Sequence, residues 1–210
     1  MRGKLNPRCG YLIGLTGNIC TGKSLALATF KKMGFQTISM DRYVDDIMSI
    51  DTSLKNKIAE KFPNSLINGN ISKKLLGNIV FHNKSAMNDL EKIFTPYAKE
   101  KIQQISNEIH TNRARSTVVE IPLLFEKKRE QYFDIIIYLF SSTKTMLNRA
   151  LKRKNMTEKK FFAILDNQAH KKEVIHKADY LIYNENRHYL LKSIKNIIHH
   201  DKFKRSDFRY

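Results

Sequence analysis

Apolar positions along the chain alternate between short continuous runs and longer stretches with helical spacing. The short runs predict strands at 11–15, 36–39, 117–121, 134–140 and 180–183. The longer stretches predict helices at 23–33, 42–50, 54–62, 72–81, 85–110, 143–154, 158–169 and 189–198. Strands that alternate with helices are typical of a parallel sheet covered on both faces. We therefore expect a three-layer α/β/α fold around a parallel sheet of about five strands.

Two helical segments interrupt the strand pattern. The stretch 42–115 contains no convincing strand, so we interpret it as a helical insertion between the second and third strands. Within it, Ser72 is expected to cap the following helix, and Thr95–Pro96 is expected to break the long helix or to start a new one. A smaller helical excursion covers about 143–170. The remaining segments, about 10–41, 116–142 and 178–200, are expected to form the core of a single domain spanning residues 1–210.

The composition indicates a globular protein with a strong positive charge. Hydrophobic residues make up 41% of the chain, which is enough for a core and excludes disorder of the whole chain. The 38 basic and 20 acidic residues give a formal charge of +18. This charge fits nucleic-acid binding, the handling of polyanionic nucleotides, or a solvated lysine-rich surface. The lysines are scattered and no nucleic-acid-binding motif is present, so nucleic acid is not an expected partner.

The sequence also bears on the cellular compartment. The longest apolar run, Ile135–Phe140, is far shorter than the roughly 20 residues that a membrane helix requires. The basic N-terminal residues lack the apolar stretch of a signal peptide. Cys9 and Cys20 have no partners at metal-site spacing and are expected to be reduced thiols. We expect a cytoplasmic protein without a membrane partner, and the sequence leaves the oligomeric state open.

The most specific motif lies between the first predicted strand and the helix after it. The segment 17–24 matches G-x-x-x-x-G-K-[ST], the phosphate-binding loop of nucleotide-binding proteins, at every fixed position. Its glycines allow a tight turn that aims backbone N–H groups at phosphate oxygens, and the following helix adds a favourable dipole. The expected nucleotide-binding residues are Gly17, Asn18, Ile19, Cys20, Thr21, Gly22, Lys23, Ser24 and Leu25.

Two side chains of this loop have expected chemical roles. Lys23 is expected to reach the β- and γ-phosphates of ATP, and the Ser24 hydroxyl is expected to bind Mg²⁺. A GTPase would carry N-K-x-D, and the nearest segment, Asn83–Ala86, lacks the aspartate. The short distance from Lys23 to the next strand, and then to Asp41, favours a nucleotide or metabolite kinase.

Several segments, in order, resemble the dephospho-CoA kinase family. The opening YLIGLTGNICTGKS at 11–24 is similar to the start of these kinases, and 34–41 is similar to their strand that ends in D-A-D. The segment 119–126, VEIPLLFE, is close to their V-P-L-L-F-E signature, and Gln168 and 178–182 resemble their Q and A-D-Y-V-I segments. The match covers about 11–198. The resemblance implies Mg²⁺-dependent transfer of phosphate from ATP to the ribose 3′-hydroxyl of dephospho-CoA, with 42–115 binding the acceptor and 143–170 forming a lid.

The resemblance also implies roles for single residues. Asp41 matches the last aspartate of D-A-D and would be the general base; otherwise it would cap the helix expected from Arg42. Arg149 and Arg153 match lid arginines and, four residues apart on one helix, would share a face. Arg149 would neutralise charge on the γ-phosphate, and Arg153 would help to bind the nucleotide. Weaker candidates are Thr16 near the phosphates, Glu120 at a metal-bound water, and Pro122–Phe125 as an apolar wall or simply core.

The chain departs from the family pattern at several positions. Thr95 stands where the family has histidine before proline, and Ser39 replaces the first aspartate of D-A-D. These differences put one acceptor contact in question and suggest a divergent member. The alternatives are a kinase for another nucleotide or metabolite, a basic nucleic-acid-binding protein with a vestigial loop, and a decayed kinase that binds without turnover.

Overall fold

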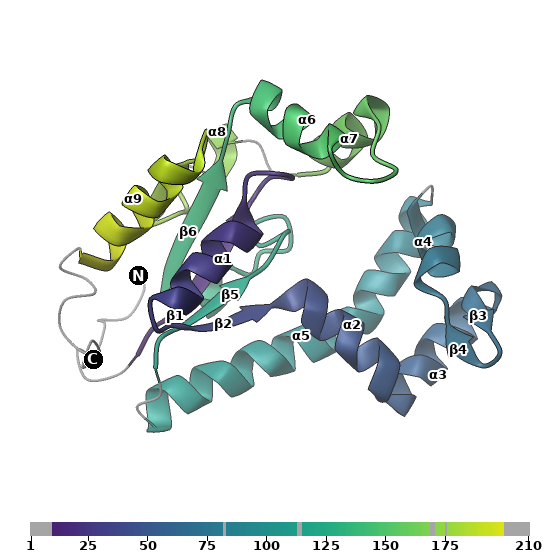
Figure 1. The fold of residues 1–210 in the computed structure, drawn as a ribbon. Helices are drawn as coiled ribbons and strands as arrows, with labels where there is room; N and C mark the ends of the chain where they lie inside the picture. Colours follow the sequence, from purple (N-terminus) through teal and green to yellow (C-terminus); the bar gives the residue numbers. More distant parts are fainter. Residues whose placement is uncertain (1–9, 82, 113–114, 169–170, 175, 200–210) are drawn as a thin grey trace. The chain divides into compact units, whose positions relative to one another are not determined.

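The computed structural model describes residues 10–81, 83–112, 115–168, 171–174 and 176–199 (Figure 1). The chain forms two compact units. The core unit comprises Met1–Ser39 and Ile105–Tyr210, and the helical unit comprises Met40–Gln104. Cys9 lies outside the described residues, and Cys20 is a buried free thiol. In the described part of the chain, no helix combines the length and apolar character needed to cross a membrane.

A five-stranded sheet forms the centre of the core unit, and all its strands are parallel. The strand order is β2-β5-β1-β6-β7, which confirms the expected parallel sheet. In the central register, Leu15 lies opposite both Glu120, where its strand ends, and Ile137, and the strand of Leu15 continues to Gly17, where the phosphate-loop motif begins. The strands are β1 (Leu12–Gly17), β2 (Gln36–Ser39), β5 (Thr117–Glu120), β6 (Ile135–Phe140) and β7 (Tyr180–Tyr183).

The two faces of this sheet are covered differently. Helices α1 (Lys23–Lys32) and α9 (Arg187–His199) pack on one face in a single apolar cluster that contains Phe30 and Ile13. On the other face at Gly14, an added Cβ would lie 2.9 Å from Leu124 and 3.0 Å from Phe133. The connection between β5 and β6 therefore packs closely on the strand at Gly14, and a larger side chain there would displace Leu124 and Phe133. A short 3-10 helix, η2 (Glu130–Tyr132), ends this connection.

Helices α6 (Thr143–Leu151), α7 (Glu158–Leu165) and α8 (Lys171–Val174) complete the core unit. Phe161 of α7 and Met146 of α6 pack in one cluster with Ile19 and Cys20 of the phosphate-loop motif. The helix expected over 143–154 ends at Leu151, so that part of the prediction was wrong. Residues 152–155 are all exposed polar residues and have no apolar face that would extend the helix.

The helical unit is built from α2 (Met40–Ile50), α3 (Thr52–Lys61), α4 (Lys73–Phe81) and the first part of α5 (Lys84–Asn112). A 3-10 turn, η1 (Pro63–Ser65), precedes a small antiparallel pair, β3 (Leu66–Ile67) and β4 (Asn70–Ile71). The sequence analysis did not predict these strands. They are joined by Asn68 and Gly69, both with positive φ, which is a typical two-residue hairpin turn.

The N-terminus of α4 and the middle of α5 test two further expectations. Ser72 accepts a hydrogen bond from the N–H of Leu75 at 3.4 Å, which confirms it as a cap. The expected break at Thr95–Pro96 was wrong, because α5 continues through Pro96. Tyr97 packs in the apolar cluster of the helical unit and Ala98 is buried, so packing beyond the proline outweighs the hydrogen bond that proline removes.

Candidate active site

The phosphate-loop motif occupies the sharp connection between β1 and α1. Its first glycine, Gly17, has φ 147°, and an added Cβ there would lie 2.1 Å from the carbonyl oxygen of Leu139. Its second, Gly22, has φ 95°, and an added Cβ would lie 2.4 Å from the side-chain nitrogen of Asn184. Both glycines are therefore required by backbone conformation and by close neighbours.

Lys23 and Ser24 follow at the start of α1. The Nζ of Lys23 donates hydrogen bonds to the carbonyl oxygens of Gly17 at 2.8 Å and Asn18 at 2.9 Å, which hold the ammonium group over the loop. Ser24 is exposed in the first helical turn. A magnesium ion bound to nucleotide phosphates needs few protein ligands, and this accessible hydroxyl fits such a role. The loop thus presents a cation, a hydroxyl and a helix N-terminus together.

Three side chains from distant parts of the core unit fix the loop. The amide N–H of Ile19 donates to Oε1 of Gln168 at 2.7 Å, the hydroxyl of Tyr138 donates to Oδ1 of Asn18, and Nδ2 of Asn184 donates to the carbonyl of Thr21 at 2.7 Å. Inside the loop, the Thr21 hydroxyl donates to the Asn18 carbonyl at 2.8 Å. The loop shape is therefore held by polar contacts from β6, from the segment after α7 and from the turn after β7.

Sequence analysis missed Tyr138 and Asn184. Tyr138 is the one residue of the apolar strand β6 that carries a polar group. This was the available sequence signal that the end of β6 contributes a hydrogen bond to the site. Burial, followed by the negative charge of Glu126, raises the pKa of Tyr138 to about 12. The hydroxyl therefore keeps its proton, and remains a hydrogen-bond donor, throughout the physiological pH range. Asn184 has no sequence signal, because its contact with the loop spans 163 residues.

Arg149 lies beside the loop. One nitrogen of its guanidinium donates to the Cys20 carbonyl at 3.3 Å and to the Ser141 hydroxyl at 3.2 Å, and the other donates to the Glu185 carbonyl at 3.1 Å. Arg153 is exposed in the turn after α6 and has left the helix. The expectation that both arginines share one helix face was therefore wrong, and the structure brings only Arg149 of the two to the loop.

The weaker candidates lie at the carboxyl ends of β1 and β5. Thr16 is buried and donates to the Pro122 carbonyl at 3.4 Å. Glu120 is buried at the end of β5, in register with Leu15 and Ser39. Leu124 and Phe125 are buried core residues, whereas Pro122 and Leu123 are half-buried.

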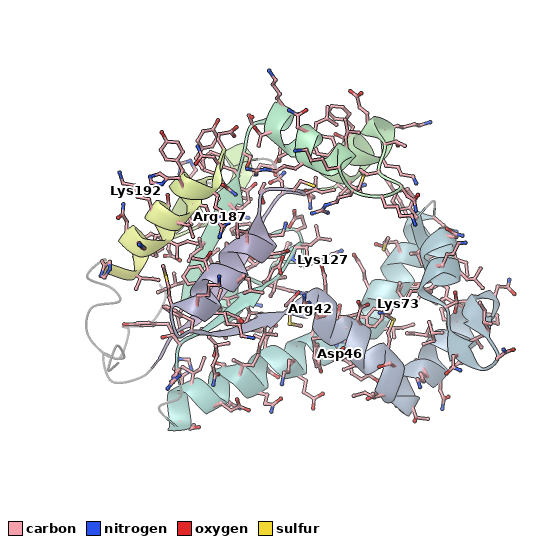
Figure 2. The ribbon with its side chains drawn as sticks, viewed as in Figure 1. Arg42, Asp46, Lys73, Lys127, Arg187 and Lys192 are labelled. Atoms are coloured by element: carbon pink, nitrogen blue, oxygen red, sulfur yellow. The ribbon has the colours of Figure 1, made fainter. Side chains whose placement is uncertain are left out.

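Asp41 belongs to the helical unit. It is the second residue of α2, two positions after the end of β2, and its side chain is exposed. Because α2 begins at Met40, the expectation of a helix from Arg42 with Asp41 as its cap was wrong. The same helix lines an open pocket of about 570 Å³. Figure 2 labels three residues that line this pocket, Arg42 and Asp46 of α2 and Lys73 of α4. Lys73 forms an ion pair with Asp45 at 2.7 Å.

A parallel sheet of this order, with the glycine loop between its central strand and α1 and a charged arginine at that loop, defines a P-loop kinase. A family model described as dephospho-CoA kinase matches residues 11–189. The chain therefore belongs to the dephospho-CoA kinase family.

Individual relatives agree with this assignment. The dephospho-CoA kinase of Legionella pneumophila (strain Paris) is 30% identical over 191 residues, covering 90% of this chain and 94% of the relative. That of Bartonella quintana (strain Toulouse) is 32% identical over 187 residues, covering 87% and 95%. The structure of dephospho-CoA kinase from Campylobacter jejuni superposes with a TM-score of 0.64 and 27% identity, covering 89% of this chain and 94% of that one.

Proposed function

We propose that this chain transfers the γ-phosphoryl group of ATP to the ribose 3′-hydroxyl of dephospho-CoA, which gives ADP and coenzyme A. The observation that carries this proposal is the phosphate loop with Arg149 hydrogen-bonded to its Cys20 carbonyl. Phosphoryl transfer depends mainly on positioning and charge neutralisation, and a loop fixed by several long-range hydrogen bonds suits both.

On the donor side, the backbone of 17–24 and the N-terminus of α1 bind the phosphates of ATP, and Leu25 continues this contact into the helix. Lys23 binds the β- and γ-phosphates. Arg149 offsets negative charge that develops on the transferred group, and Arg153 contributes from the turn that follows α6. Ser24 and the phosphates would hold Mg²⁺, which would supply further charge neutralisation.

On the acceptor side, Asp41 takes the proton from the 3′-hydroxyl as the phosphoryl group arrives. The exposure of its carboxylate and its place just after β2 support this role, because ligands of parallel α/β sheets bind beyond the carboxyl ends of the strands. The helical insertion, about 42–115, binds the rest of the acceptor. The segment 143–170 acts as a lid, and the enzyme works in the cytoplasm.

The test measures ADP release with ATP and Mg²⁺, with and without dephospho-CoA. We expect release to depend on dephospho-CoA and to fall by about 10²- to 10⁴-fold in kcat for Asp41→Asn, because the amide cannot accept the proton. Glu60→Gln makes the same charge change at an exposed position of α3 and should stay within about twofold of wild type. Release without any dependence on dephospho-CoA would refute the reaction, whereas a fully active Asp41→Asn enzyme would refute only the base.

A further inference from the structure

The turn after β7 is attached to the phosphate loop. Its first residue, Asn184, is almost fully buried, and its backbone N–H donates to the Phe140 carbonyl at 2.8 Å at the end of β6. The Asn184 side chain donates to the Thr21 carbonyl at 2.7 Å and fills the space beside Gly22. This turn therefore has a fixed place relative to the loop.

The next residue, Glu185, forms hydrogen bonds with the start of α6. Its carboxylate accepts the backbone N–H of Ser142 at 2.6 Å, and it also accepts the hydroxyls of Ser142, at 3.1 Å, and Thr145. The hydrogen bond from Thr145, followed by that from the Ser142 backbone, holds the pKa of Glu185 below its ordinary 4.5. The carboxylate is therefore ionised at neutral pH, where a negative charge at a helix N-terminus is favourable.

The same helix returns a contact to the turn through Arg149. Its guanidinium donates to the Glu185 carbonyl at 3.1 Å and to the Ser141 hydroxyl at 3.2 Å, and Ser141 in turn donates to the Asn184 carbonyl at 2.6 Å. Its remaining contact is the Cys20 carbonyl of the loop. The turn thus contacts both the first residues of α6 and the functional end of Arg149.

Helix capping alone does not explain Glu185. The N-cap of α6 is Ser142, whose hydroxyl already accepts the N–H of Thr145 at 3.2 Å. The Glu185 side chain adds a link between this helix and the turn after β7. A guanidinium has a rigid fork of donors, so a small shift of α6 would separate its nitrogens from the Cys20 and Glu185 carbonyls.

We infer that Glu185 is a positioning residue for phosphoryl transfer: its carboxylate fixes α6 so that Arg149 stays at the phosphate loop. This inference rests on the role proposed above for Arg149. The Glu185 carboxylate forms hydrogen bonds with Ser142 and Thr145 at the start of α6, so it acts through the arginine. Removing its carboxylate should therefore lower kcat and leave the KM for dephospho-CoA unchanged.

The experiment is a double-mutant cycle on the full-length protein with Glu185→Ala, Arg149→Ala and the double variant. We expect Glu185→Ala to lower kcat about tenfold in wild type and less than about twofold in the Arg149→Ala background. Glu185→Gln should recover most of the loss, because its amide oxygen can still accept the Ser142 N–H. Asn186→Ala is the matched control: it removes the cap of α9 from the same turn, where Asn186 accepts the Tyr189 N–H at 3.0 Å, and should leave kcat unchanged.

The outcomes distinguish the positioning role of Glu185 from the proposed role of Arg149. Equal losses from Glu185→Ala in the wild-type and Arg149→Ala backgrounds, or no loss at all, would overturn the positioning role. A fully active Arg149→Ala enzyme would instead overturn the role of the arginine itself. If Glu185→Ala does not fold, Glu185→Asp completes the cycle, because its shorter side chain keeps the charge but draws it back from Ser142. Melting temperatures of all variants identify losses that arise from unfolding.

Discussion

Different kinds of interaction stabilise two regions of the molecule. One region is the phosphate-loop end of the core unit, and the other is the helical unit. The loop forms directional hydrogen bonds with the side chains of Tyr138, Gln168 and Asn184, which come from three separate segments. The helical unit is held mainly by one apolar cluster shared by α2, α3, α4 and α5. Its buried members include Ile47, Met48, Leu54, Ile58, Phe62, Leu76 and Val80.

This difference matches what each region is proposed to do. Hydrogen bonds depend steeply on distance and angle, so the loop is confined to one shape, as binding of a triphosphate requires. Apolar contacts are non-directional and tolerate repacking when volume is conserved. The helical unit can therefore vary its surface for an acceptor while keeping its core, and we expect substitutions in the two regions to affect different measurable quantities.

Lys23→Ala should have the largest effect on activity. The substitution removes the ammonium group held by the Gly17 and Asn18 carbonyls, and we expect kcat to fall about 10³-fold or more. The free energy of unfolding should change by less than about 1 kcal/mol, because no core side chain is lost. Steady-state kinetics and urea unfolding measure the two quantities, with exposed Lys31→Ala of the same helix as control. Activity within tenfold of wild type would contradict the donor-side assignment.

Ile58→Ala should have the opposite profile. Ile58 is fully buried in the apolar cluster of the helical unit, so we expect a loss of about 2–5 kcal/mol in the free energy of unfolding. Ile50→Ala makes the same chemical change at a side chain that is 75% exposed and should cost less than about 0.5 kcal/mol. Urea titrations of both variants measure this difference. Similar losses for the two would mean that the cluster is not what holds this unit together.

Tyr138→Phe should have the smallest effect, and its pH dependence reports the burial of the hydroxyl. Losing the hydrogen bond to Asn18 should cost about 0.5–1.5 kcal/mol at neutral pH. The pKa of Tyr138 rises from 10.0 to about 12 on folding, so between these values the folded state binds more protons than the unfolded state. Stability is therefore lost as pH rises through this interval, and Phe at 138 should reduce that loss. Urea unfolding at about pH 9 and pH 11.5 measures it; equal slopes for both proteins would contradict the burial of this hydroxyl.

The features predicted correctly from sequence are those encoded locally. The phosphate loop is a contiguous motif between a strand and a helix, and most of the five strands are short apolar runs, so their spacing was sufficient. Tyr138, Asn184 and Glu185 were missed as site-building residues because their partners lie 40 to 163 positions away. Sequence spacing carries no information about such contacts until the sheet order is known.

The errors within the helices have a related cause. Pro96 predicted a break from its local chemistry, but Phe94 and Tyr97, on either side of it, pack against the buried apolar cluster and keep α5 continuous. The early end of α6 and the start of α2 at Met40 depend on which side chains find an apolar surface, and the sequence pattern specifies this only approximately. Asn68–Gly69 was an available hairpin signal, but the strands that it joins are only two residues long.

The contact between Gly22 and Asn184 also constrains the order of events during synthesis. The loop leaves the ribosome before Arg149, Gln168 and Asn184, which hold its shape, because the contacts that join them span 129 to 163 residues. Strand β7 must join β6 before the turn behind it can reach the loop. The nascent chain therefore carries its complete nucleotide-binding motif long before that motif has its final geometry, which is reached only after Asn184 has been synthesised.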